Sequence, residues 1–115
     1  MAEENKYPLD YERRFGGVAK LYTKAGAERL KNAHVCVVGL GGVGSWAAEA
    51  LARTAVGRIT LVDLDNVAES NTNRQLQAMT GVYGKPKVDA TAERIHAINP
   101  LCDCRKIEDF IEVET

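Results

Sequence analysis

The stretch that decides the fold is His34–Gly44, HVCVVGLGGVG, in which a short apolar run rich in β-branched residues leads into a glycine-rich turn. The run predicts a strand, and the apolar residues after the turn predict a helix. Gly39, Gly41 and Gly44 are spaced to permit a tight turn, close approach of the backbone to a pyrophosphate, and close packing of the helix on the strand. Because a helix N-terminus also presents unpaired N–H groups to anions, the stretch predicts a phosphate cradle.

Length and charge set the broad class. The chain has 115 residues, 27% of them charged, and a formal net charge of −1, which argues against a wholly basic nucleic-acid clamp. No apolar run approaches the roughly 20 residues that span a bilayer, and the opening MAEENKYPLD lacks the apolar segment of a secretory signal. We therefore expect a soluble cytoplasmic protein with no membrane association.

The 3 cysteines form an odd set in a chain without an export signal, so we expect reduced thiols. Cys36 lies within the predicted first strand and is expected to be a buried apolar side chain. Cys102 and Cys104 alternate along another predicted strand, which places both sulfurs on one face without a second ligand pair. No metal site is expected from them.

The order of predicted elements indicates an α/β fold. A helical arm at residues 11–31, interrupted by Gly16, Gly17 and Gly26, precedes strands at 34–38, 58–62 and 101–107 and helices at 43–53 and 86–98. The connection over residues 66–84 is expected to contain one short helix. In the first core helix, the residues expected to face the sheet are Val43, Trp46, Ala47, Ala50 and Leu51.

This order predicts a Rossmann-like, doubly wound parallel sheet that stops after about three strands. Three strands are half of a typical nucleotide-binding sheet, so we expect a truncated or fragmentary chain. Residues 1–32 would form an N-terminal helical arm, and residues 33–115 the N-terminal half of an ATP-binding domain. The uncovered third strand would favour association with another chain.

Polar residues follow the second predicted strand. Asp63 stands where a carboxylate could accept hydrogen bonds from ribose hydroxyls, which alone would suggest NAD, or it could simply cap a turn, and Asp65 is a second candidate. Downstream lie Asn71 and Arg74, and Lys87 opens the second helix. NAD binding does not require these groups, whereas attack on the α-phosphate of a triphosphate develops charge that Arg and Lys neutralise.

Lys87 is informative because a cation in the first turn of a helix opposes the helix dipole, which is understandable if an anion binds there. The alternative is an ordinary solvated lysine, as expected for Lys85. From the residues alone, Arg14 is expected to be a solvated surface charge or part of an exposed ion pair.

Three segments resemble the ubiquitin-activating-type adenylating superfamily, which includes the activators of molybdopterin- and thiamine-pathway sulfur carriers. They are GLGGVGSWAAEALAR, DLDNVAESNTNRQ and GKPKVDATAERIHAINP, and the resemblance extends over nearly the whole chain. The segments RFGGVAKLY and GSWAAEALAR are most similar to the branch that cyclises a threonylcarbamoyl group on tRNA at the expense of ATP.

The resemblance implies a role for each matching residue. Gly42 would offer its backbone to the phosphates within the cradle of Gly39, Gly41 and Gly44, Asp63 would bind the ribose, Asn71 and Arg74 would contact phosphates, and Lys87 would contact the α-phosphate. Arg14, with Arg13 as the adjacent alternative, resembles an arginine that reaches the triphosphate of the partner subunit in a homodimer. The resemblance also implies ATP with Mg²⁺, whose aspartate ligand would lie beyond Thr115.

The implied reaction is adenylation of the threonyl carboxylate on modified tRNA, followed by ring closure. The first alternative is an adenylyltransferase for the C-terminus of a ubiquitin-like sulfur carrier, with a sulfur-carrier or cysteine desulfurase system as partner. A second alternative, based on the glycine turn and Asp63 alone, is an NAD-dependent oxidoreductase. A third is a noncatalytic module that only assembles with itself.

Overall fold

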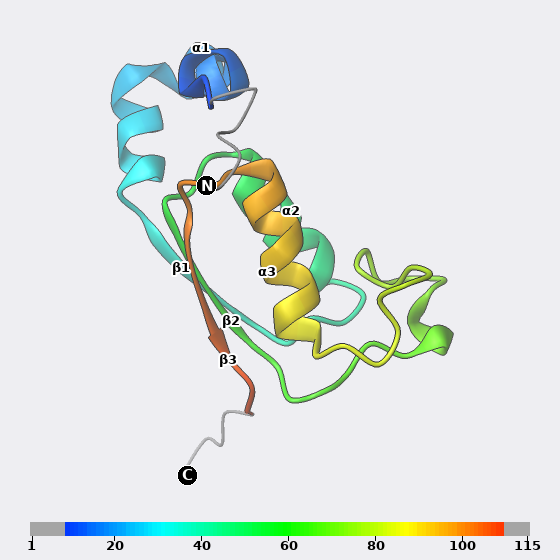
Figure 1. The fold of residues 1–115 in the computed structure, drawn as a ribbon. Helices are drawn as coiled ribbons and strands as arrows, with labels where there is room; N and C mark the ends of the chain where they lie inside the picture. Colours follow the sequence, from blue (N-terminus) through cyan, green and yellow to red (C-terminus); the bar gives the residue numbers. More distant parts are fainter. Residues whose placement is uncertain (1–8, 110–115) are drawn as a thin grey trace, which may run out of the picture.

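The fold is a three-stranded parallel sheet with two helices packed across one face (Figure 1). The structure is a computed structural model, and it describes residues 9–109. The strands are β1 (His34–Val38), β2 (Arg58–Val62) and β3 (Asp103–Ile107), in the order β1-β2-β3. Both neighbouring pairs are parallel, with Val35 opposite Ile59 and Ile59 opposite Cys104. The predicted α/β fold with a parallel sheet is confirmed.

Helices α2 (Gly44–Arg53) and α3 (Lys87–Ile98) form the two crossovers and pack against each other over the same face of the sheet (Figure 1). The core between these helices and the sheet is apolar and well buried. Its largest fully buried side chains are Leu40, Ile59, Leu61, Ile95, Val56 and Val88. Both helices begin on the side of the sheet where the strands end. The glycine turn and the start of α3 therefore lie at the same end of the sheet.

The predicted sheet-facing side of α2 is wrong at Val43, Trp46 and Ala50, whereas Leu51 packs against the core as predicted. Val43 and Trp46 are 85% and 54% exposed, and the helix instead buries Ser45, Ala48 and Ala52. Small side chains let α2 lie close to both α3 and the sheet. The close fit of the glycine turn on β1 sets the rotation of the helix about its axis. Apolar periodicity does not contain this constraint, so the predicted face is rotated away from the face that is buried.

Cys36 is exposed, which corrects its prediction as a buried side chain. Along β1, Val37 is buried beneath the helices, whereas His34, Cys36 and Val38 alternate onto the opposite face. Within residues 9–109 no helix covers that opposite face. The strand was therefore predicted correctly, but its second face is open in this chain.

Helix α1 (Tyr11–Lys31) is kinked at Thr23, where φ is 68° and ψ is 167°, and not at its glycines as expected. The hydroxyl of Thr23 accepts a hydrogen bond from the N–H of Gly26 at 3.2 Å, so Thr23 caps the second half of the helix. At the other end of α1, the carbonyls of Leu30 and Ala33 accept hydrogen bonds from Gly57 and Arg58. These bonds fasten the arm to the start of β2.

The connection between β2 and α3 contains one 3₁₀ turn, η1 (Glu69–Asn71), as predicted. An isolated bridge between Asn66 and Pro86 closes this connection, and α3 begins one residue after Pro86. Helix α3 buries Val88, Thr91, Ala92 and Ile95, which recur at helical spacing along its sequence. Among the described helices, none has the length and apolar character needed to cross a membrane.

Gly44 begins α2 at a point where the backbone passes within contact of Gly39. A Cβ at position 44 would lie 1.8 Å from the carbonyl oxygen of Gly39, so no other residue fits without moving the turn. Gly39 itself has φ +87°, a left-handed conformation that strongly favours glycine. The turn geometry therefore depends on glycine at both positions.

Replacing Gly44 by alanine is expected to destabilise the chain by more than the ~1–3 kcal/mol usual for an overpacked core, because the clash is with backbone. Thermal and urea unfolding measure the effect. The matched control is Gly17→Ala in α1, where nothing lies within 4 Å of the added Cβ. That control should be neutral or stabilising by about 0.5–1 kcal/mol. Equal stability of Gly44→Ala and the parent chain would refute the close contact.

Candidate nucleotide-binding site

The candidate site lies at the carboxyl ends of β1 and β2. An open cavity of about 340 Å³ is found there, lined by Val38, Gly39, Val62, Asp63, Leu64, Asp65 and Asp109. In open parallel sheets ligands bind outside the carboxyl ends of the strands, next to the turn that follows the first strand. The cavity therefore has the position that the sequence predicts for the nucleotide.

Asp63 is joined to the glycine turn by its side chain. Its Oδ2 accepts a hydrogen bond from the N–H of Leu40 at 2.7 Å, and its Oδ1 accepts one from the N–H of Asp65 at 2.8 Å. The side chain of Gln77 donates to the carbonyl of Leu40 at 3.0 Å. Both backbone groups of Leu40 are thus held, and each carboxylate oxygen of Asp63 keeps a lone pair for a further donor.

The glycine turn presents free backbone donors. Among residues 9–109, no acceptor takes the N–H of Gly41, Gly42 or Gly44. These amides lie at the N-terminus of α2, which has no side-chain cap. A helix N-terminus with unpaired amides and the positive end of its dipole attracts an anion such as phosphate.

Arg74 lies against this turn. Its Cβ, Cγ and Cδ atoms are 3.8–3.9 Å from the ideal Cβ position of Gly42, so its stem runs along the glycine backbone. The guanidinium donates to the carbonyl of Ser70 and to Oδ1 of Asn73. Arg74 is exposed, so further guanidinium donors remain available beside the turn.

Asn71 and Lys87 are both buried, with 8% and 6% of their surfaces exposed. The Oδ1 of Asn71 accepts a hydrogen bond from the N–H of Ala68, so this side chain also shapes the 3₁₀ turn. Lys87 is the first residue of α3, and its N–H donates to the carbonyl of Asp65 at 2.9 Å. Within the described part of the chain its ammonium has no ion pair. A solvated surface lysine, the alternative interpretation, does not fit this burial.

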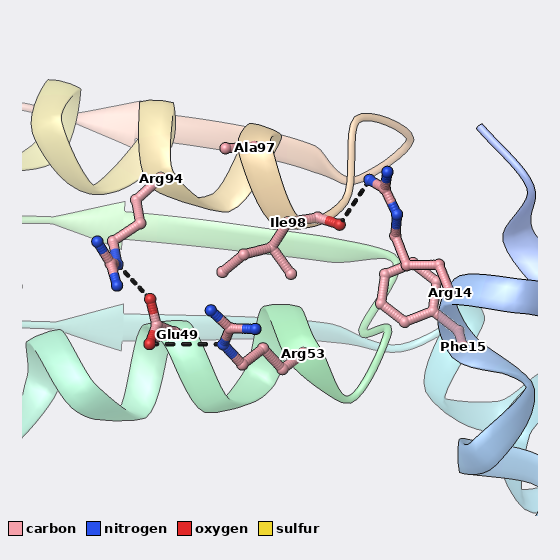
Figure 2. A pocket seen from close by; sticks show the side chains of 7 residues that line it. All are labelled: Arg14, Phe15, Glu49, Arg53, Arg94, Ala97 and Ile98. Atoms are coloured by element: carbon pink, nitrogen blue, oxygen red, sulfur yellow. Dashed lines mark hydrogen bonds and ion pairs between the residues drawn. The ribbon is translucent and has the colours of Figure 1, made fainter. Parts of the chain in front are cut away.

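Arg14 is not near the cradle of its own chain. Its guanidinium donates to the carbonyl of Ile98 at the end of α3, about 16 Å along that helix from Lys87 by the helical rise (Figure 2). There it lines a cavity with Glu49, whose carboxylate pairs with Arg53 and Arg94. Any contact of Arg14 with a triphosphate would have to be made in another copy of the chain.

Three residues of the site were missed by the sequence reasoning. Gln77 holds the carbonyl of Leu40, Ser45 Oγ accepts from the N–H of Leu76 at 3.2 Å, and the ring N–H of Trp46 donates to the carbonyl of Arg74 at 3.1 Å. A buried glutamine or serine has no periodic signature. The only available signal was a polar residue placed among apolar ones, as Ser45 is in the first turn of α2.

The two C-terminal cysteines do not form a metal site with other described residues. Burial raises the pKa of the Cys104 thiol to about 11, and burial also raises the pKa of Cys102. Both thiols are therefore protonated near neutral pH and are poor nucleophiles there. Among residues 9–109 no group of three or more His, Cys, Asp or Glu side chains is arranged to hold a metal ion.

A parallel sheet whose first strand runs into a glycine turn, with an acid at the end of the second strand, is typical of nucleotide-binding α/β proteins. The ThiF family model matches residues 11–115. The chain belongs to the ThiF family, and the resemblance to adenylating enzymes drawn from its three segments is confirmed.

Two relatives show how far the similarity extends. The chain is 51% identical over 105 residues to the tRNA threonylcarbamoyladenosine dehydratase of Haemophilus influenzae, covering 91% of this chain and 40% of that protein. It is 45% identical over 75 residues to the molybdopterin-synthase adenylyltransferase of Salmonella typhimurium, covering 65% of this chain and 30% of that protein.

The crystal structure of the Escherichia coli tRNA N6-threonylcarbamoyladenosine dehydratase in complex with ATP has the same fold. It superposes with a TM-score of 0.87 at 51% identity, covering 88% of this chain and 42% of that chain. The present chain thus spans about 40% of the length of the dehydratases it matches.

Asp63→Ala is expected to lower the free energy of unfolding by about 1–3 kcal/mol, since the N–H groups of Leu40 and Asp65 lose their acceptor. Urea unfolding measures the loss. The matched control is Asp65→Ala, because that carboxylate accepts no hydrogen bond from residues 9–109, and its effect should stay within about 0.5 kcal/mol. Equal effects of the two substitutions would contradict the structural role of Asp63.

Proposed function

We propose that this chain is the ATP-binding part of a cytoplasmic enzyme that dehydrates threonylcarbamoyladenosine in tRNA. The observation that carries the proposal is the glycine turn with its unpaired amides, flanked by the stem of Arg74 and by Asp63. Similarity to a dehydratase that was crystallised with ATP supports ATP as the nucleotide.

The described residues fit such a nucleotide. Unpaired amides at Gly41 and Gly42 would hold phosphate oxygens, and the missing side chain at Gly44 lets the turn stay close to β1. The remaining lone pairs of Asp63 would accept the ribose hydroxyls. The guanidinium of Arg74 and the ammonium of Lys87 would balance the phosphate charge.

Asn71 has a narrower role in this proposal. Its Oδ1 already accepts from the N–H of Ala68, so only its Nδ2 donors are available to a phosphate oxygen. Both Asn71 and Lys87 are held in fixed positions by burial, which suits a contact that must be present before the nucleotide arrives.

The chemistry needs positioning and charge neutralisation more than a nucleophile from the protein. The threonyl carboxylate would attack the α-phosphorus and release pyrophosphate, and an oxygen or nitrogen within the same modification would then displace AMP and close the ring. Arg74 and Lys87 would neutralise charge that develops on the α-phosphate and on the leaving pyrophosphate. No cysteine of this chain is required for either step.

Two further parts of the proposal depend on groups outside this site. Mg²⁺ would accompany ATP, and the resemblance to the adenylating enzymes implies that its aspartate ligand comes from outside the described residues. Arg14 lies at the far end of α3, so its contact with a triphosphate would require a homodimer in which the arm reaches the partner.

The chain should bind ATP, and Arg74→Ala or Lys87→Met should weaken binding by about tenfold or more, because each removes one charge-assisted contact. Lys87→Met keeps the buried stem while removing the ammonium. Isothermal titration calorimetry measures the affinity, and thermal unfolding checks that the variants fold. Lys24→Met, at an exposed lysine in the arm, is the control. Unchanged affinity in both site variants would remove these residues from the proposal.

The substrate is tested in a protein of the full family length that carries this segment. Pyrophosphate release should depend on tRNA bearing the threonylcarbamoyl modification and should be absent with a sulfur-carrier protein. Similarity to molybdopterin-synthase adenylyltransferase makes the carrier the second candidate. Release with the carrier alone would establish that alternative, and tight NAD binding that ATP does not displace would favour an oxidoreductase.

A further inference from the structure

The first turn of α2 holds the segment that carries Arg74. The ring Nε1–H of Trp46 donates to the carbonyl of Arg74 at 3.1 Å, and Ser45 Oγ accepts from the N–H of Leu76 at 3.2 Å. These bonds join residues 28 and 31 positions apart in the sequence. They connect the helix that follows the glycine turn to the loop that places Arg74 beside it.

Trp46 contributes little to the apolar core. Its side chain is 54% exposed and lies outside the core clusters of the described residues. An exposed indole still loses rotamer freedom when it is held in one orientation. Within residues 9–109, the hydrogen bond to Arg74 is the one directional contact of this ring. The ring therefore contributes to the structure through this hydrogen bond and not through burial.

The position of the Arg74 guanidinium depends on the position of its loop. The guanidinium is bound to Ser70 and Asn73, both in the same loop, and not to the sheet or to α2. The stem lies along Gly42, where a small shift of the backbone would lift it from the glycine turn. A hydrogen bond to the carbonyl of Arg74 fixes the backbone of the residue that carries the guanidinium.

We propose that Trp46 is a positioning residue whose indole N–H, by holding the carbonyl of Arg74, sets the place of the Arg74 guanidinium at the glycine turn and thereby raises the affinity for a nucleoside triphosphate. The ligand in this statement rests on the proposed function. The positioning itself is a property of the ligand-free chain and is tested separately.

The first test is hydrogen–deuterium exchange on the ligand-free chain. Trp46→Phe keeps an aromatic ring and removes the N–H, so amides of residues 74–77 should exchange about fivefold faster, while those of α3 stay unchanged. The control is Tyr22→Phe, which removes the polar atom of another half-exposed aromatic side chain, in α1. Unchanged exchange in residues 74–77 would overturn the positioning role.

The second test is a double-mutant cycle on ATP affinity, measured by calorimetry. Trp46→Phe should weaken ATP about fivefold in the parent chain and have little effect when Arg74 is already alanine, because the tryptophan acts through that arginine. An equal loss in both backgrounds would overturn the proposal. If the parent chain binds no ATP, the proposed function fails, whereas the exchange experiment still decides whether Trp46 positions the loop.

Discussion

The contact between the carbonyl oxygen of Gly39 and the backbone of Gly44 leaves no room for a Cβ, and the rest of the site depends on it. It draws the N-terminus of α2 against the end of β1, so the turn between them is short and its amides face outward. The same contact sets the rotation of α2, which is why the helix buries the small residues Ser45, Ala48 and Ala52. One steric constraint thus shapes both the cradle and the packing behind it.

Polar side chains around this turn hold its backbone in place through hydrogen bonds. Asp63 and Gln77 hold the two backbone groups of Leu40, and the first turn of α2 holds the loop that carries Arg74. A site whose backbone is already held in place loses less conformational entropy on ligand binding than a flexible site does. Asp63 is therefore a structural acceptor as well as the proposed ribose ligand, and a loss of nucleotide binding on its removal would combine both effects.

The three cations that are proposed to contact phosphate lie at opposite ends of the sheet. Arg74 and Lys87 belong to the connection and helix that follow the site, whereas Arg14 lies at the C-terminal end of α3, where a cation stabilises the helix dipole. Within one chain, Arg14 therefore binds only a backbone carbonyl at the end of a helix. Its proposed role in a homodimer would exchange this contact for one with the phosphates of the neighbouring subunit.

The order of strands and helices, the glycine turn, the acid at the end of β2 and the buried face of α3 were all predictable from the sequence. Each depends on residues close together in the chain, where hydrophobic periodicity and turn chemistry act. The resemblance in three segments also identified the family, because it matched residue types and spacing beyond the turn itself. The kink at Thr23 was missed because a threonine cap competes locally with the helix and looks no different in sequence from a helical threonine.

The sequence by itself determined which elements form and where the glycine turn begins, since local sterics and periodicity decide both. Only the tertiary structure decided the rotation of α2, the exposure of Cys36, and the bonds from Trp46, Ser45 and Gln77 to partners 28–37 residues away. Those features depend on which surfaces meet when the crossovers close over one face of the sheet. No pattern within a single segment carries that information.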